Sequence, residues 1–279
     1  MILSGKSSLL LILILFFWNN GNAQNLFNAE NSKKFAQYLV NTQQYRLAAT
    51  EYERILNIEK SDTAVYSGLL KTYRMGNICE NTFENLNTLD VYKFFLNNTV
   101  ASEYLKLVLT CNCCFHESHF SEALSSVDYN RQVFYKLGYY LLSEQKDSLS
   151  LLTFHNYNFL SNSYPEVLKG IENIQSFKRK SPDLAITMSA VIPGSGKAYS
   201  SYWGDAIMSF VFVSTNAWLS YRGFNKNGVK SANGWIFGSI SLGFYLGNIW
   251  GSGRAVKTYN QIEYQKLYNE AKNDIYNHF

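Results

Sequence analysis

The chain has 279 residues, of which 47% are hydrophobic and only 16% are charged, and its formal net charge is +4. Charged residues make up about 25% of an ordinary soluble protein, so this composition predicts that part of the chain is unusually apolar. Basic residues do not alternate with aromatic ones along any stretch, as a groove for single-stranded nucleic acid requires. We therefore expect no nucleic-acid partner.

Residues 1–23 have the pattern of a targeting segment. Lys6 provides a positive start, an apolar run follows over residues 9–18, and Gly21-Asn22-Ala23 supplies small residues before Gln24. The run is short for a bilayer about 30 Å thick, which favours a cleaved signal peptide and a mature chain outside the cytoplasm. An uncleaved membrane anchor is the alternative.

Residues 24–164 are predicted to form paired helices. Tyr45, Ala48 and Tyr52 follow one another at helical spacing, and the pair Ile55-Leu56 closes the stretch. This spacing resembles the second helix of a tetratricopeptide repeat, in which the small residue allows two helices to approach closely. Less regular copies of the pattern begin near residues 64, 120 and 134, so we expect about four hairpins. An ordinary helical bundle remains the alternative.

The resemblance implies that these repeats form a concave surface for a peptide or a helix of a partner protein, with Tyr45, Ala48 and Tyr52 at the groove. Stacked helical repeats bind other proteins and seldom catalyse reactions. Ser-His-Asp arrangements, paired carboxylates and dinucleotide fingerprints are not evident in the sequence. We therefore predict a non-enzymatic protein-binding module without a cofactor.

One stretch is rich in cysteine and histidine, and Cys79 is the only cysteine outside it. Its members are Cys111, Cys113, Cys114, His116 and His119. Three interpretations stay open: a structural disulfide with buried thiols, a metal site, or a redox-active C-x-x-C pair. An even number of cysteines outside the cytoplasm favours the disulfide, and we expect no bound metal.

Residues 165–182 are predicted as one helix followed by a basic linker. The run Lys178-Arg179-Lys180 ends the helix, and Pro182 follows it. We expect this linker to mark a domain boundary and to lie at lipid headgroups.

Residues 183–254 are predicted as a membrane domain. An apolar segment over 184–192 is too short to cross a bilayer and ends at Pro193-Gly194, so residues 184–202 are expected to be re-entrant or interfacial. Two longer apolar runs over 206–221 and 232–250 are predicted as transmembrane helices, with tryptophans mostly near their ends. Residues 255–279 should form an amphipathic tail helix that lies on the membrane or docks on the helical hairpins.

The second apolar run carries small residues at intervals of four or five. They are Gly234, Gly238, Gly243, Gly247 and Gly251. Such ladders allow helix backbones to touch within lipid. We expect this helix to pack on the preceding one, with homo-oligomerisation as the alternative.

The loop between the two runs indicates an orientation. It contains Arg222, Lys226 and Lys230 and no acidic residue, which favours the cytoplasmic side. Together with a cleaved signal peptide, this predicts a bacterial inner-membrane protein whose repeats lie in the periplasm.

The turn before the first run resembles a signature of uncharacterised bacterial membrane domains, Pro-Gly-x-Gly-x-x-Tyr. It is formed here by Pro193, Gly194, Gly196 and Tyr199. The resemblance implies a membrane location and little about activity. Lys197 stands where the signature has glutamine, which puts any shared ligand in doubt.

Lys197 and Asp205 are the only charged residues between Asp183 and Arg222. We expect them to pair and to anchor the turn at the membrane surface. The alternative is a polar site of Lys197, Tyr199, Asp205 and Asn216 in a membrane-embedded enzyme or transport component.

Overall fold

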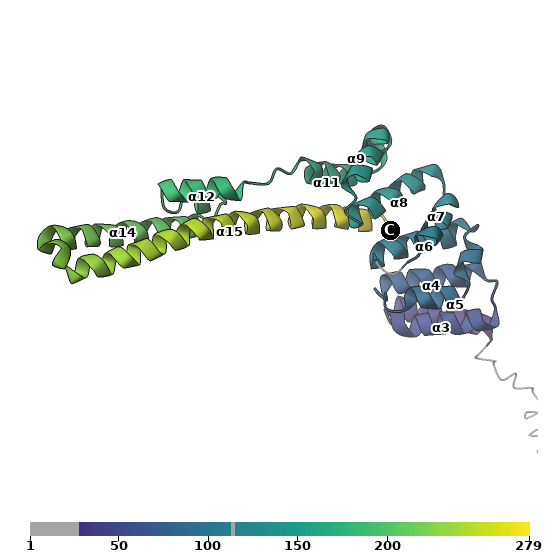
Figure 1. Cartoon of the computed structure of the whole chain (residues 1–279). Coiled ribbons are helices and arrows are strands. Elements are labelled where there is room, and N and C mark those ends of the chain that lie inside the picture. The colour runs from purple at the N-terminus through teal and green to yellow at the C-terminus, as the bar shows by residue number, and fades with distance from the viewer. Residues whose placement is uncertain (1–27, 113–114) are drawn as a thin grey trace, which may run out of the picture. The chain divides into compact units, whose positions relative to one another are not determined.

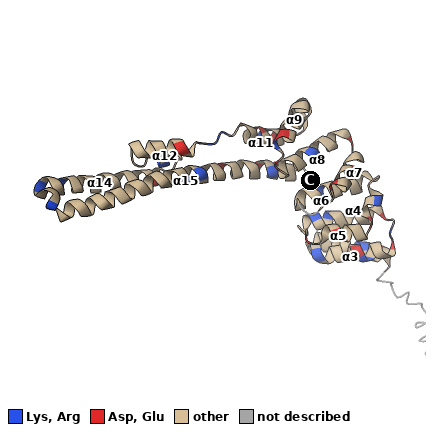
Figure 2. Ribbon diagram, viewed as in Figure 1, with Lys and Arg blue, Asp and Glu red and all other residues tan. Residues whose placement is uncertain are grey.

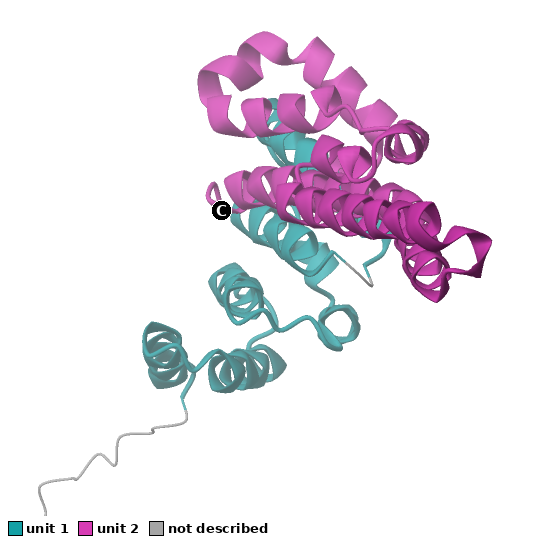
Figure 3. Cartoon of the chain, turned by 90° about the vertical axis from the view of Figure 1, so that its left-hand side faces the viewer, with its two compact units in different colours: residues 1–139 teal, residues 140–279 magenta. Residues whose placement is uncertain are grey.

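The computed structural model describes residues 28–112 and 115–279, and every regular element there is a helix (Figure 1). The predicted all-α fold is confirmed. The chain divides into two compact units, the first ending at Tyr139 and the second beginning at Tyr140 (Figure 3). The signal peptide predicted for residues 1–23 lies outside the described residues.

Unit 1 is a succession of helices that pack on their neighbours along the chain. α2 packs on α3, α3 on α4, α4 on α6 and α6 on α7. The bounds are α2 (Ala29–Asn41), α3 (Tyr45–Ile58), α4 (Thr63–Met75), α5 (Thr82–Thr88), η1 (Val91–Phe94), α6 (Asn98–Cys111), α7 (Glu117–Ser125) and α8 (Tyr129–Leu142), within which the border falls. Between α4 and α6, which pack on each other, the chain forms only the short α5 and η1.

Side-chain caps set where several of these helices begin. Asn28 and Asn97 each accept a hydrogen bond from a backbone N–H in the first turn of the helix that follows. Asp62 does the same for α4 and also forms a 2.6 Å ion pair with Lys33 of α2. The Lys33 ammonium holds the pKa of Asp62 below its usual value. This ion pair joins the start of α4 to α2.

The core of unit 1 contains several tyrosines. Tyr66, Tyr73 and Tyr104 are almost completely buried. The ring of Tyr104 lies 4.8 Å from that of Phe95, and the ring of Tyr66 stacks on Phe94 at 4.4 Å. Aromatic burial of this kind contributes strongly to stability, so part of the high aromatic content of the sequence is accounted for by this core.

Unit 2 is built along one helix of 45 residues, α15 (Ala232–Tyr276), which packs against α11, α12, α13 and α14. The other elements are α9 (Lys146–His155), α10 (Tyr157–Ser163), α11 (Pro165–Ser176), α12 (Pro182–Val191), α13 (Ser195–Tyr199), α14 (Trp203–Asn227) and η2 (Gly228–Lys230). The sequence prediction extended the repeat domain to residue 164. The structure instead places α9 and α10 in unit 2, where both contact α11.

The tail is not a separate helix. The sequence predicted a new helix over 255–279, whereas α15 continues through Gly251 and Gly253. A Cβ at Gly253 would lie 2.8 Å from the Ile186 side chain, so this glycine allows α12 to approach closely. Further along, Ala271 lies against Gly170 of α11. The tail therefore docks on a helix of its own unit.

Within the described residues, no helix reaches the combination of length and mean hydropathy that crossing a membrane requires. The apolar runs predicted over 206–221 and 232–250 are helical, within α14 and α15, but their prediction as transmembrane helices is not supported by this criterion.

Candidate functional site

The Pro-Gly turn brings three helices together at backbone distance. Gly194 has φ of +90°, and a Cβ there would lie 2.2 Å from the carbonyl oxygen of Ala206 in α14. A Cβ at Gly196 would lie 2.0 Å from the carbonyl oxygen of Ala185 in α12. Both positions therefore require glycine, because a larger residue would overlap with main-chain atoms.

Buried hydroxyl groups attach this turn to α15. The Ser189 hydroxyl accepts a hydrogen bond from the backbone N–H of Gly196 at 2.9 Å and lies 2.6 Å from the Ser252 hydroxyl. Ser252 in turn donates to the carbonyl oxygen of Asn248 at 2.8 Å. Both serines are completely buried. The Pro-Gly-x-Gly-x-x-Tyr segment therefore lies where α12, α13 and α15 are joined by hydrogen bonds.

The basic linker takes part in the structure as well. The Lys180 ammonium donates to the carbonyl oxygen of Tyr199 at 2.8 Å and lies 4.0 Å from the ring centre of Tyr259. The side chain of Asn260 hydrogen-bonds to both the backbone N–H and the carbonyl of Lys180. Lys180, which belongs to the linker predicted to lie at lipid headgroups, thus also holds that linker to α15.

α14 and α15 meet along a seam of small and polar residues. Every seventh residue is buried, and the set is Ala206, Val213 and Ser220 of α14 with Gly234, Ser241 and Asn248 of α15. The Ser220 hydroxyl donates to the Gly234 carbonyl at 2.8 Å, and the Ser241 hydroxyl donates to the Val213 carbonyl at 3.0 Å. The same antiparallel register places Asn248 opposite Ala206.

The glycine ladder serves two purposes. Gly234 and Gly238 face α14, where a Cβ would meet Phe224 and Ser220, as the sequence predicted. Gly243 and Gly247 do not pack on α14, since a Cβ at either position would meet no atom within 4 Å. The prediction that the whole ladder packs on the preceding helix is wrong for these two positions, which border open space. It also fails for Gly251, where a Cβ would meet only the Lys197 side chain of α13, at 3.7 Å.

Large apolar side chains cover the outside of this hairpin. Residues such as Ile207, Trp235 and Trp250 are each about three-fifths exposed. The wider set comprises Met208, Phe210, Val211, Phe212, Trp218, Ile236, Ile240, Leu242, Phe244 and Leu246. Apart from the basic tip where α14 and α15 meet, Figure 2 shows few charged residues along α14 and the first part of α15. The hairpin therefore has an interior seam with polar residues and a largely apolar exterior.

A cavity of about 280 Å³ opens beside the seam and contains the charged pair that the sequence singled out. Lys197 and Asp205 both line it, together with Ser209 and Asn248. The expected ion pair does not form, and the Lys197 ammonium donates to the Ser209 hydroxyl at 2.8 Å. The other two members of the proposed polar site lie elsewhere: the Tyr199 hydroxyl faces the backbone N–H of Ser181, and the Asn216 amide binds its own helix.

Sequence reasoning missed Ser209 and Asn248. An amide within an otherwise uncharged apolar run is the signal that draws attention to Asn248, since a buried polar group needs a partner. The role of Ser209 depends on how α13 folds back over α14, which no local pattern in the sequence shows.

The residues predicted for a partner groove in unit 1 lie between its own helices. Ala48 is completely buried. Tyr52 and Tyr45 lie against α4. A Cβ at Gly68 would be 2.9 Å from the Tyr52 ring, and a Cβ at Gly76 would be 2.6 Å from Tyr45. Burial raises the pKa of Tyr52. These side chains therefore contribute to packing between the helices of unit 1.

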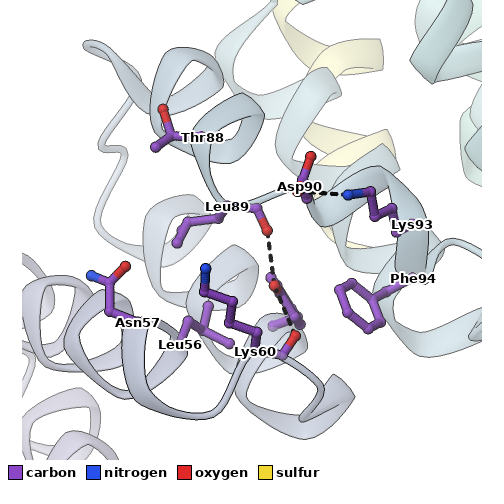
Figure 4. A pocket seen from close by; sticks show the side chains of 9 residues that line it. Leu56, Asn57, Lys60, Thr88, Leu89, Asp90, Lys93 and Phe94 are labelled. Atoms are coloured by element: carbon purple, nitrogen blue, oxygen red, sulfur yellow. Dashed lines mark hydrogen bonds and ion pairs between the residues drawn. The ribbon is translucent and has the colours of Figure 1, made fainter.

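Unit 1 also has a small cavity of about 190 Å³ beside Tyr66 (Figure 4). The Tyr66 hydroxyl donates to the carbonyl of Leu89 at 2.8 Å, and Lys93 pairs with Asp90 at 2.7 Å. Because these polar groups already have partners, the cavity offers a ligand few free hydrogen-bonding groups.

The cysteine-rich stretch provides one half of a disulfide. Cys111, the last residue of α6, is bonded to Cys79, 32 residues earlier. Cys113 and Cys114 lie outside the described residues. His119 stacks on the Tyr92 ring at 3.5 Å, and His116 precedes α7. Among the residues that the structure describes, no three His, Cys, Asp or Glu side chains converge as a metal site.

Comparison with known proteins gave no match among family models, curated protein sequences or solved structures.

Replacing Gly196 with alanine should destabilise unit 2 by about 1–3 kcal/mol, because the new methyl group overlaps with the Ala185 carbonyl. Gly204→Ala is the matched control, since its Cβ would meet no atom within 4 Å. Chemical denaturation of the purified full chain measures the difference in the free energy of unfolding. Equal stability of the two variants would contradict the close approach.

Replacing Cys79 and Cys111 with serine should lower the free energy of unfolding of unit 1 by about 2–4 kcal/mol, because the loop that the bond closes gains freedom when unfolded. Unfolding of the full chain, followed with and without reductant, measures this loss. Non-reducing peptide mapping provides the control, and a bond from Cys111 to Cys113 or Cys114 would contradict the pairing.

Proposed function

We propose that this chain is a membrane-anchored, non-enzymatic binding protein, in which the α14–α15 hairpin is embedded in lipid and the helices of unit 1 bind a protein partner. The observation that carries the proposal is the distribution of side chains on the hairpin. The polar residues of its seam, Ser220, Ser241 and Asn248, are buried, whereas its large apolar residues are exposed. Water-soluble helices show the opposite distribution.

This distribution also explains why the mean hydropathy of α14 and α15 is modest although their exposed surface is apolar. Glycine, serine and asparagine lower the average of each helix, yet those on the seam face the partner helix and not the surroundings. Small and hydroxyl residues are the usual contacts between helices in lipid. The surface that lipid would touch is therefore more apolar than the helix average suggests.

The two ends of the hairpin carry the residues expected at lipid headgroups. Trp218 and Trp235 lie towards the tip, and Trp203 and Trp250 lie towards the other end. Arg222 and Arg254 lie over the rings of Trp218 and Trp250 at 4.9 Å. Amphipathic aromatic rings and long cationic side chains both favour the membrane interface.

For unit 1 the proposal rests on its successively packed helices and their resemblance to tetratricopeptide repeats. Phe35 and Tyr38 are more than half exposed on one side of α2, so they offer an apolar contact for a helix or peptide. The Cys79–Cys111 bond fits an oxidising compartment. We place unit 1 in the periplasm of a bacterial inner-membrane protein on that basis.

The full chain should float with phospholipid vesicles in a density gradient. Ile207→Lys with Val211→Lys should abolish flotation, because each charge placed in lipid costs about 2.5–3.5 kcal/mol. Val229→Lys is the control, since Val229 is 80% exposed in η2 at the tip. Recovery of the wild-type protein at the bottom of the gradient, with its helical circular dichroism retained, would contradict the proposal.

Photo-crosslinking amino acids at Phe35 and Tyr38 should capture the same protein from intact membranes, because both side chains lie on one side of α2. Leu96, which is 94% exposed in the turn before α6, is the matched control. Mass spectrometry of the crosslinked bands identifies the partner. Identical products from all three positions would argue against a specific surface.

A further inference from the structure

The seam between α14 and α15 has three layers, and the third is open. Ser220 with Gly234 and Ser241 with Val213 close the first two layers by hydrogen bonds. In the third, Asn248 is 3% exposed and lies opposite Ala206, which offers no polar side chain. Neither the nitrogen nor the oxygen of the Asn248 amide has a hydrogen-bond partner. A buried amide without partners is unfavourable, so this layer is suited to receive a ligand.

The cavity at this layer supplies both signs of charge. Lys197 and Asp205 line it from α13 and α14 without forming an ion pair, and Ser209 accepts from Lys197. Donors are thus available from the Lys197 ammonium and the Asn248 amide, and Asp205 provides a carboxylate. A ligand that carries a phosphate and an ammonium group together would satisfy all of them.

The remaining wall of the cavity is apolar and open. Gly243 and Gly247 line it where a Cβ would meet no atom within 4 Å. Phe212 and Phe244 stack beside them with ring centres 5.3 Å apart. The cavity of about 280 Å³ therefore has polar groups on one side and an apolar wall on the other, which matches a headgroup joined to acyl chains.

We propose that this cavity binds the headgroup of a zwitterionic phospholipid of the phosphoethanolamine type. Lys197 and the Asn248 amide hold the phosphate, Asp205 accepts from the ammonium group, and Gly243 and Gly247 leave room for an acyl chain. The inference rests on the proposed membrane location, and it adds a specific lipid site to a hairpin that otherwise needs only an apolar surface.

The test uses the full chain, stripped of lipid in detergent and then supplied with phosphatidylethanolamine, phosphatidylcholine, phosphatidylglycerol or soluble glycerophosphoethanolamine. Native mass spectrometry measures the retained ligand, and thermal unfolding measures the stabilisation. We expect stoichiometric retention of phosphatidylethanolamine and a raised unfolding temperature. Lys197→Met and Gly247→Leu should weaken retention about tenfold or more. Asn216→Leu is the control, because Asn216 binds its own helix.

Asn248→Leu separates a binding role from a purely structural one. Without lipid this variant should unfold at a higher temperature than the wild type, because it removes an unpartnered amide, and added phosphatidylethanolamine should not stabilise it. A lower unfolding temperature with lipid retention unchanged would overturn the proposal. Equal retention of all lipids, preference for the soluble headgroup, or a dimer that replaces the lipid would also overturn it.

Flotation of the same variants distinguishes failure of the lipid-binding cavity from failure of the membrane location. Asn248→Leu and Gly247→Leu should still float with vesicles, since their apolar exterior is intact. If they float and also retain the lipid, the pocket fails while the membrane location stands. If the wild type does not float, the membrane location itself fails.

Discussion

Unit 2 depends on one constraint, the approach of main chain to main chain where the α12–α13 turn meets α14 and α15. Gly194 touches the carbonyl of Ala206, and Gly196 touches that of Ala185. Because these contacts leave no room for side chains, the three helices are held at a fixed separation. Ser189 and Ser252 then satisfy the polar groups that this close packing removes from solvent. At this joint, glycines that allow close approach and serines that form hydrogen bonds take the place of large apolar side chains.

The sequence predicts this turn because Pro193-Gly194 is a local signal that breaks a helix. It also predicts the all-helical class and the glycine contacts of Gly234 and Gly238. It does not predict which residues the turn touches, since Ala206 and Ser252 lie far along the chain. A series of small residues shows which face of a helix another helix can approach, but it does not show which helix does so. For this reason the sequence predicts a contact of Gly243 and Gly247 with α14 that the structure does not contain. Nor does the local pattern show that α9 and α10 contact α11, which places them in the second compact unit although the predicted repeat domain extends to residue 164.

The cysteine-rich stretch also shows that a local pattern does not identify the partner that a residue contacts in the fold. Close spacing of Cys111, Cys113 and Cys114 directs attention to the cluster itself, whereas Cys111 bonds to Cys79 across α5 and α6. Local density of reactive residues is therefore a poor guide to pairing when the fold brings together the ends of successive helices. In the candidate site, spacing found Lys197 and Asp205, but only the register of the seam brings Asn248 to the same cavity.

α15 connects these features in a single element. Its first half carries the apolar exterior and the seam, and its second half packs on α11 through Ala271 and the buried Ile275. Since no break divides the helix at Gly251 or Gly253, the face at Asn248 and the face that contacts α11 belong to one uninterrupted element. The seam beside Lys197 and the packing on α11 therefore both depend on the same continuous backbone, which no local pattern in either half of the helix shows.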